Sequence, residues 1–286
     1  MEKKLIPEIL DLWAKGLLIP YLGPAVHGLD GTPENPDTPE RLVEILTRKV
    51  TVPHKIRKNL TAAGQYIENF KHRKTLVAQL NEAFSHSSRP NVLHGWLAKT
   101  GAACPLIVDV WYDPSLLDAF KDRTDFGFVQ GVSRAEHLNE WVHFYDASRN
   151  RTSENASSEW STLLYQPLGC VAPDSNYILS DSDYVEVLTE IDIQTPIPER
   201  VRELRSGRHF LFLGCRFTTQ LERTYARQIM KRSSDTHWVV LSETPTRNEL
   251  RFLEEQGIQR IDMPLDLFVK ALTKGHTESL EVAQVA

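Results

Sequence analysis

The chain has 286 residues, of which 41% are hydrophobic and 25% are charged, so it is long enough to bury a core in one large or two small domains. No apolar run reaches the roughly 18 residues that a membrane-spanning helix needs, and the first residues alternate charged and apolar side chains instead of forming a signal peptide. The formal net charge is -5 with both signs interspersed, which argues against nucleic acid as a partner. We therefore expect a soluble, cytoplasmic protein with neither a membrane nor a nucleic-acid partner.

The three cysteines, Cys104, Cys170 and Cys215, lie far apart and form no CxxC pair. This spacing provides neither a disulfide framework nor a structural zinc site, so we expect buried thiols and no zinc. The densest basic stretch, residues 223–232, lies within one predicted helix, and a solvated helix face accounts for it.

The chain begins with a predicted helix and a short strand. Apolar side chains recur at helix spacing over residues 6–13, and Gly16 follows as a helix terminator. Residues 17–22 form a short apolar run that predicts a buried strand. This strand leads into a loop from Gly23 to Gly28, a strand-to-turn transition that is typical of phosphate-binding loops.

The middle of the chain predicts a helical insertion and then a central strand. Residues 41–84 have mainly helical patterns, so we expect the insertion at about residues 40–100. The apolar run at residues 104–110 has the length of a strand, and residues 127–132 predict another short strand. The polar segment 147–159 has no periodicity and predicts a mobile loop.

Strands and helices alternate in the last third of the chain. Two of its helices are predicted to begin at a capping box, formed by Thr219 with Glu222 and by Thr246 with Glu249. This alternation predicts right-handed crossovers and a parallel sheet. We therefore expect an α/β fold, a Rossmann-like parallel sheet with helices on both faces and a helical insertion. The strands expected in this part are 209–213, 237–241 and 258–261. We expect a single domain over residues 1–273 and a flexible tail over residues 274–286.

Three loops are expected to meet at the carboxyl edge of this sheet, where open α/β folds bind ligands. The first contains Gly23, Pro24, Ala25 and Val26. It departs from a glycine-rich phosphate loop because Pro24 has no N–H to donate and Ala25 places a methyl group where a second glycine leaves room. A tight strand-to-helix turn explains the same residues equally well.

The second loop contains Asp109, Trp111 and Asp113 at the end of the central strand. Two carboxylates four residues apart suit ribose hydroxyls or acid–base chemistry. A structural role for Asp113, capping the turn that Pro114 makes, has about the same weight.

The third loop contains Gly214, Cys215, Arg216 and Phe217, where a strand ends in glycine before a helix. A nest of backbone amides with Arg216 beside it suits a phosphate or an adenosine. A plain turn with Arg216 in a surface ion pair is the alternative. No motif places a base beside Cys215, so a nucleophilic role for this thiol is disfavoured.

Three segments, taken together, resemble the sirtuin-like family. The run LLIPYLGPAVHG at residues 17–28 is similar to the family's opening LIPFLGAGVS, and HFLFLGCRF at residues 209–217 is similar to its late strand and turn. His94 with CPLIVDVWYD at residues 104–113 is similar to the family's histidine-led helix and its IVTTNYD element. The order and spacing of these segments cover nearly the whole chain and resemble the zinc-free branch common in bacterial NADases and defence proteins.

The resemblance implies NAD chemistry, but the residues that perform it differ. Active members use the asparagine of the TTNYD element and the histidine of an LHG element to hold the nicotinamide ribose and cleave the glycosidic bond. This chain has Trp111 and Leu168 at those positions, with Leu168 immediately before Gly169. Neither side chain can accept a ribose hydroxyl proton, so ordinary NAD cleavage lacks both of its side-chain agents.

We therefore expect a catalytically degenerate protein that binds NAD or ADP-ribose and has a regulatory or scaffolding role. One alternative is an active NAD-cleaving hydrolase whose chemistry has moved to His27, Asp109 or Asp113. The other is a ligand-free structural protein, and the assembly of relatives implies a homo-oligomer. The residues expected to contact the nucleotide are Gly23, Pro24, Ala25, Val26, Trp111, Asp113, Gly169, Gly214, Cys215, Arg216 and Phe217.

Overall fold

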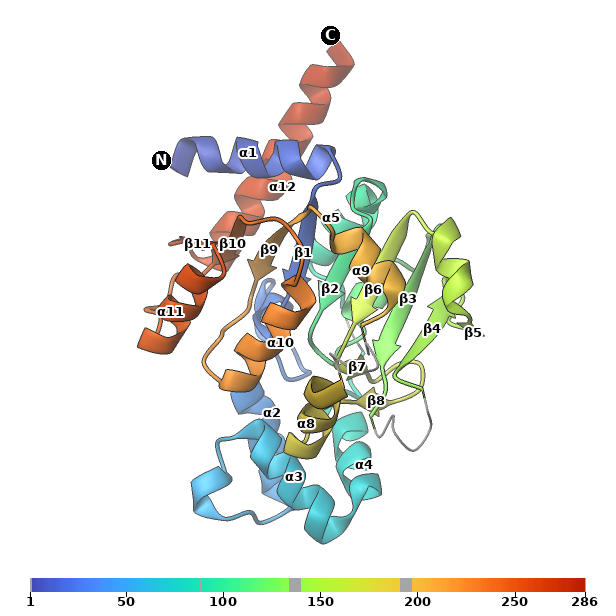
Figure 1. Cartoon of the computed structure of the whole chain (residues 1–286), viewed down its shortest axis with the longest axis vertical. Helices are drawn as coiled ribbons and strands as arrows, with labels where there is room; N and C mark the ends of the chain where they lie inside the picture. Colours follow the sequence, from blue (N-terminus) through green and yellow to red (C-terminus); the bar gives the residue numbers. More distant parts are fainter. Residues whose placement is uncertain (1, 88, 134–139, 191–196, 286) are drawn as a thin grey trace.

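A computed structural model describes residues 2–87, 89–133, 140–190 and 197–285. Its centre is a nine-stranded sheet in the order β11-β10-β9-β1-β2-β6-β3-β4-β5, with a separate two-stranded β7-β8 ribbon (Figure 1). The strands are β1 (Leu18–Leu22), β2 (Leu106–Asp109), β3 (Phe126–Gly131), β4 (Val142–Asp146), β5 (Arg151–Thr152), β6 (Thr162–Gln166), β7 (Gly169–Cys170), β8 (Asn176–Tyr177), β9 (His209–Leu213), β10 (His237–Val240) and β11 (Ile258–Ile261).

The seven strands from β11 to β3 are parallel, which confirms the expected α/β class. The strands β4 and β5 add an antiparallel edge. The expectation of a mobile loop over residues 147–159 was wrong in part, because this segment contains β5 and a 3-10 helix, η4 (Glu154–Glu159). A two-residue edge strand pairs through its backbone alone, so it needs no apolar alternation that a sequence could reveal.

Alternate residues of each central strand contribute to two apolar clusters, one on each face of the sheet. In β1, Ile19 and Tyr21 belong to one cluster, whereas Leu18 and Leu22 belong to the other. This division follows the two-residue period of a strand. Because both faces are covered, the central strands are apolar throughout and not alternating in polarity.

Helices cover both faces, as expected. One face carries α8 (Asp181–Glu190), α9 (Glu199–Arg205), α10 (Gln220–Met230) and α11 (Arg247–Glu255). The other carries α1 (Glu2–Ala14), α5 (Val92–Thr100), α6 (Ser115–Ala119) and α12 (Leu265–Val285). In the described part of the chain, no helix combines the length and the apolar character that a membrane crossing requires.

The helical insertion consists of three helices that pack on one another beyond the carboxyl edge of the sheet (Figure 1). It is shorter than the expected residues 40–100, because α5 packs on one face of the sheet. They are α2 (Pro39–Lys49), α3 (Leu60–Lys71) and α4 (Arg73–Ala83). Arg73 joins this insertion to α8, because its Nη1 donates to Asp183 Oδ2 at 2.7 Å. The same Asp183 carboxylate accepts from the backbone N–H groups of Leu179 and Ser180, so the start of α8 is fixed against the insertion.

Candidate functional site at the carboxyl edge of the sheet

The loops that follow β1, β2 and β9 lie at the same edge of the sheet. The Gly23 N–H donates to Leu213 O at 2.8 Å, and the Val110 N–H donates to Leu22 O at 2.9 Å. Adjacent parallel strands impose this arrangement, because each strand reaches the edge with its carboxyl end. The parallel topology therefore brings the three candidate loops together.

The first and third loops are in direct contact with each other. A Cβ at Gly23 would lie 2.4 Å from Gly214 O and 2.7 Å from Cys215 Sγ. Gly214 has φ +67, and a Cβ there would lie 2.6 Å from Val26 N. Both positions therefore require glycine for the contact between the two loops.

The backbone amides of the first loop already have protein partners. The Ala25 N–H donates to Gly214 O at 3.2 Å, and the Val26 N–H donates to Gly23 O at 3.3 Å. Pro24 has no N–H and begins the 3-10 helix η1 (Pro24–Gly28). In this arrangement the loop is a tight turn, and these amides do not point freely at a phosphate.

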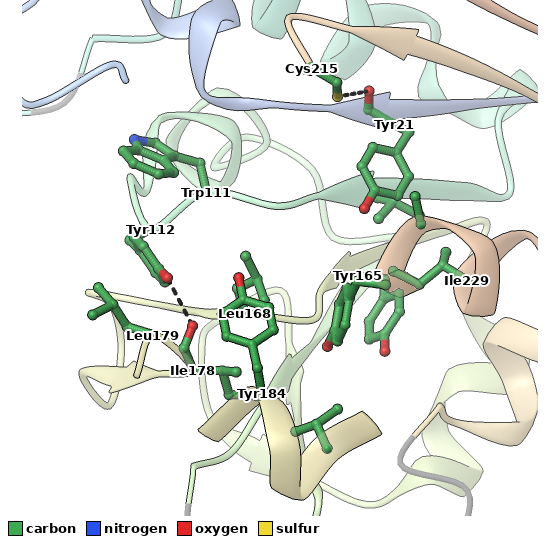
Figure 2. Close-up of a cluster of buried hydrophobic side chains, with 14 of the residues drawn as sticks. Tyr21, Trp111, Tyr112, Tyr165, Leu168, Ile178, Leu179, Tyr184, Cys215 and Ile229 are labelled. Atoms are coloured by element: carbon green, nitrogen blue, oxygen red, sulfur yellow. Dashed lines mark hydrogen bonds between the residues drawn. The ribbon is translucent and has the colours of Figure 1, made fainter. Parts of the chain in front are cut away.

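The second loop places Trp111 in an apolar environment. Its indole is 3% exposed, its Nε1–H donates to Pro36 O at 2.8 Å, and its ring lies 5.2 Å from the ring of Tyr112. Tyr112 in turn donates its hydroxyl to Ile178 O at 2.8 Å (Figure 2). Trp111 is therefore fixed by both packing and a hydrogen bond to the segment before α2.

Leu168 belongs to the same apolar cluster and is also buried (Figure 2). Its carbonyl accepts from the Ile178 N–H at 2.9 Å, and Gly169 follows in β7 with φ +79. A Cβ at Gly169 would lie 2.2 Å from Asn176 O, so the β7-β8 ribbon requires this glycine. The side chains at both substituted positions are thus part of the core.

Asp109 is buried at the end of β2 between the second loop and β6. Its carboxylate accepts from the Trp111 N–H and from Gln166 Nε2, each at 3.3 Å. Burial raises the pKa of Asp109 to about 8, although the Gln166 hydrogen bond opposes the shift. Gln166 also accepts from Gln130 Nε2 at 2.8 Å, and neither glutamine was identified from the sequence because no local motif marks them.

Asp113 has the structural role that the sequence offered as one alternative, and it also contacts two side chains of the first part of the chain. It caps the following turn, because its Oδ1 accepts from the Ser115 N–H at 2.8 Å. The same Oδ1 lies 3.6 Å from His27 Nδ1, and Oδ2 accepts from Asn35 Nδ2 at 2.7 Å. Asn35, which comes from a turn-rich segment, carried no sequence signal for this contact.

His27 packs against His94 with the ring centroids 5.2 Å apart. Burial lowers the pKa of His27, against the attraction of Asp113 and Asp37, and burial lowers the pKa of His94 well below its usual value. The Nε2 atoms of both histidines are buried without a hydrogen-bond partner in the described structure. Burial thus disfavours the charged form of both rings, one of which, His27, belongs to η1 in the first loop.

The third loop places Arg216 in an ion pair with two glutamates. Its Nε and Nη2 donate to the two carboxylate oxygens of Glu249, each at 2.9 Å, and its Nη1 donates to Glu243. Glu249 also accepts from the N–H of Phe217 at 3.1 Å. This geometry favours the ion-pair interpretation of Arg216 over a free phosphate contact.

Cys215 is buried beside the first loop, and its thiol donates to Tyr21 O at 3.5 Å (Figure 2). Burial raises its pKa well above the usual value, so the thiolate that a nucleophile requires is disfavoured. All three cysteines are free and buried. No group of three or more His, Cys, Asp or Glu side chains in the described ranges is arranged to hold a metal ion.

The fold defines an α/β protein with a mostly parallel, Rossmann-like sheet and loops gathered at the carboxyl ends of its strands. The model of the SIR2-like domain family matches residues 105–261, which is more than half of the chain. The chain therefore belongs to the SIR2-like domain family.

Solved structures of Sir2 proteins are also similar to the chain. A Sir2 enzyme structure has 14% identity and a TM-score of 0.47, covering 96% of this chain and 98% of that one. A Sir2 complex with a p53 peptide and NAD+ has 12% identity and a TM-score of 0.42, covering 94% and 98%. The comparison with curated proteins gave no match.

Proposed function

We propose that this SIR2-like protein is catalytically degenerate and has a regulatory or scaffolding role instead of cleaving NAD. One observation carries the proposal. Trp111, at the position of the asparagine in the resembling family, is buried and hydrogen-bonded to Pro36 O at 2.8 Å. Leu168, at the histidine position, is packed in the same apolar cluster. A ribose hydroxyl would find no proton acceptor in either side chain.

Binding of NAD or ADP-ribose is a further part of this proposal. In the arrangement described, the backbone amides of the first loop and Arg216 are not free to contact a nucleotide phosphate. The Gly23, Ala25 and Val26 amides donate to protein carbonyls, and Arg216 is paired with Glu249. A nucleotide phosphate would have to separate the first and third loops or break that ion pair. Nucleotide binding through these particular groups would therefore need a rearrangement of this edge, whereas a scaffolding role would not.

A turnover assay combined with calorimetric titration tests the proposal. We expect no cleavage of a fluorogenic NAD analogue above a blank without protein. Titration with NAD, ADP-ribose and nicotinamide then separates a nucleotide-binding regulator from a ligand-free scaffold. Turnover comparable to that of an active SIR2-like enzyme would contradict the degenerate assignment.

The rival function is NAD hydrolysis by relocated chemistry, and the His27 and Asp113 pair favours it. The Nδ1 of His27 lies 3.6 Å from the Asp113 carboxylate, and its Nε2 has no partner in the described structure. Asp109, with a pKa of about 8, is a suitable proton donor at neutral pH. NAD turnover that disappears in both His27→Ala and Asp109→Asn would support this function over the degenerate one.

The zinc-free bacterial branch, a cytoplasmic location and a homo-oligomer remain predictions. Size-exclusion chromatography with light scattering of the full chain measures the oligomer directly. A metal analysis of the purified protein measures zinc.

A further inference from the structure

A polar groove lies between α10 and α11, on the face of the sheet that these two helices cover. It has a volume of about 350 Å³, and it is lined by Arg223 and Arg227 of α10 and by Arg251 and Glu255 of α11. None of these residues belongs to the candidate site at the carboxyl edge. The groove is therefore a separate feature of the molecule.

Each helix contributes residues at positions i, i+3, i+4 and i+7, which form one continuous stripe along a helix. The apolar residues that attach these helices to the core, such as Tyr225, Ile229 and Leu253, are buried elsewhere. Neighbouring crossover helices on a sheet commonly meet through apolar side chains. The stripe is therefore mainly polar, and its one large apolar member, Phe252, is buried beneath Arg227, whose guanidinium lies 6.0 Å from the ring centroid.

Positive charge exceeds negative charge in the groove. Glu255 is shared, because it accepts from Arg251 Nε at 2.7 Å and lies 3.6 Å from Arg227 Nη2. Arg223 instead donates its Nη1 to the Phe217 and Thr218 carbonyls at 2.6 and 2.8 Å, which holds its guanidinium in place. Three guanidinium groups therefore face one carboxylate in a chain whose net charge is -5.

We propose that this groove binds an acidic helical segment of a partner protein. Arg223 and Arg227 are four residues apart, one helical turn or about 6 Å along α10, and glutamates four residues apart on a partner helix repeat at the same spacing. Guanidinium groups bind carboxylates in a bidentate geometry. Gln220 and Asn248, at the amino-terminal end of the groove, add neutral donors.

The openness of the groove favours a macromolecular partner over a small anion. The side chains of Arg227 and Arg251 are 48% and 77% exposed, and Gln220 and Asn248 are exposed as well. Small-molecule sites usually enclose most of their ligand, about 70–90% of its surface. A row of carboxylates on a protein surface needs no such enclosure.

Fluorescence anisotropy of a labelled helical peptide with glutamates four residues apart tests this proposal on the full chain. We expect Arg227→Gln/Arg251→Gln to weaken binding at least tenfold, and Glu255→Gln to strengthen it, because the internal carboxylate then no longer competes. The matched control Arg48→Gln/Lys270→Gln removes two exposed positive charges on α2 and α12 and should change affinity less than twofold.

Three results would overturn the proposal. They are the absence of peptide binding to the wild-type chain, equal affinities for wild type and Arg227→Gln/Arg251→Gln, and tighter binding of tripolyphosphate than of the peptide, which would make the groove a phosphate site. Circular dichroism of each variant confirms that the fold is retained. The opposite sign expected for Glu255→Gln distinguishes a binding groove from a general loss of stability.

Discussion

Arg216 and Glu249 form a two-bond ion pair that joins the loop after β9 to the first turn of α11, with both bonds at 2.9 Å. The Glu249 carboxylate is fully buried, and it also accepts from the Thr246 and Phe217 N–H groups. One buried charge therefore fixes the third loop, which in turn contacts the first.

Removing Arg216 should destabilise the protein, because Glu249 would remain buried without its cation. We expect Arg216→Ala to lower the free energy of unfolding by about 2 kcal/mol, a value reduced because the Arg216 side chain is 31% exposed. Arg251→Ala, with a side chain 77% exposed, is the control and should change it by less than about 0.5 kcal/mol. Urea unfolding measures both, and equal effects would contradict a structural role for the pair.

The same ion pair predicts a loss of stability in acid. Burial alone would raise the pKa of Glu249, but the bonds from Arg216 and the backbone amides outweigh it and lower the pKa to about 2. The ionised Glu249 therefore contributes its full stabilisation above pH 4.5, the pKa of glutamate in the unfolded chain. This contribution is lost as the pH falls toward 2, the folded pKa. We expect the acid limb of a pH–stability profile to be shallower in Glu249→Gln than in wild type, and parallel limbs would contradict this prediction.

Asp109 predicts a pH dependence of the opposite sign. Its folded pKa, about 8, lies above the unfolded value of 3.8, so the folded state retains a proton that the unfolded state loses. The contribution of Asp109 to stability is therefore complete below pH 3.8 and declines as the pH rises toward 8. Asp109→Asn should therefore gain stability relative to wild type between pH 5 and pH 8.

Urea unfolding at pH 5, 6.5 and 8 measures this difference. The control is Asn69→Ala, which changes an exposed uncharged side chain on α3, removes no titratable group and should show a difference that is constant with pH. A constant difference for Asp109→Asn as well would mean that Asp109 is ionised in the folded protein at all three values.

Gly23 and Gly95 offer a matched pair of alanine substitutions. A Cβ at Gly23 would lie 2.4 Å from Gly214 O, whereas a Cβ at Gly95, inside α5, would meet nothing within 4 Å. We expect Gly23→Ala to destabilise by at least about 2 kcal/mol, and Gly95→Ala to stabilise by up to about 1 kcal/mol through the better helix propensity of alanine. Thermal unfolding in the same buffer compares the two, and a neutral Gly23→Ala would mean that the two loops are not in contact.

Trp111 should contribute to stability, as expected for a residue that fills the core. Trp111→Ala removes a buried indole and the bond to Pro36 O, so we expect a loss of about 3–5 kcal/mol. Phe70→Ala is the control, since Phe70 is 64% exposed, and should cost less than about 1 kcal/mol. A small effect for Trp111→Ala would instead indicate a side chain kept for ligand contact.

The last third of the chain could be predicted closely, because its signals are local. Thr219 with Glu222 and Thr246 with Glu249 both form the complete capping boxes that their spacing indicates. The apolar runs before them become β9 and β10 as expected, because each is buried on both faces. Local patterns were therefore sufficient for these strands, whereas β6, which lies between β2 and β3 in the sheet, was not predicted.

The candidate site could be predicted only as a set of loops. Arg216 was identified, but its partners Glu243 and Glu249 come from the loop after β10 and the first turn of α11. The partner of Trp111, Pro36, comes from the turn-rich segment before α2. A sequence carries no local signal for such contacts, which depend on where the strands bring distant loops. The resemblance could locate the substituted positions, whereas only the structure shows how they are packed.

The position of β1 has a consequence for synthesis of the protein. This strand lies between β2 and β9, and all five of its residues, from Leu18 to Leu22, are in register with His209 to Leu213. One neighbour of β1 is thus made early, but the other leaves the ribosome only after residue 213 has been translated. Until then the nascent chain exposes one unpaired, apolar edge of β1, so the sheet is completed late. Chaperones would protect the nascent chain during this interval.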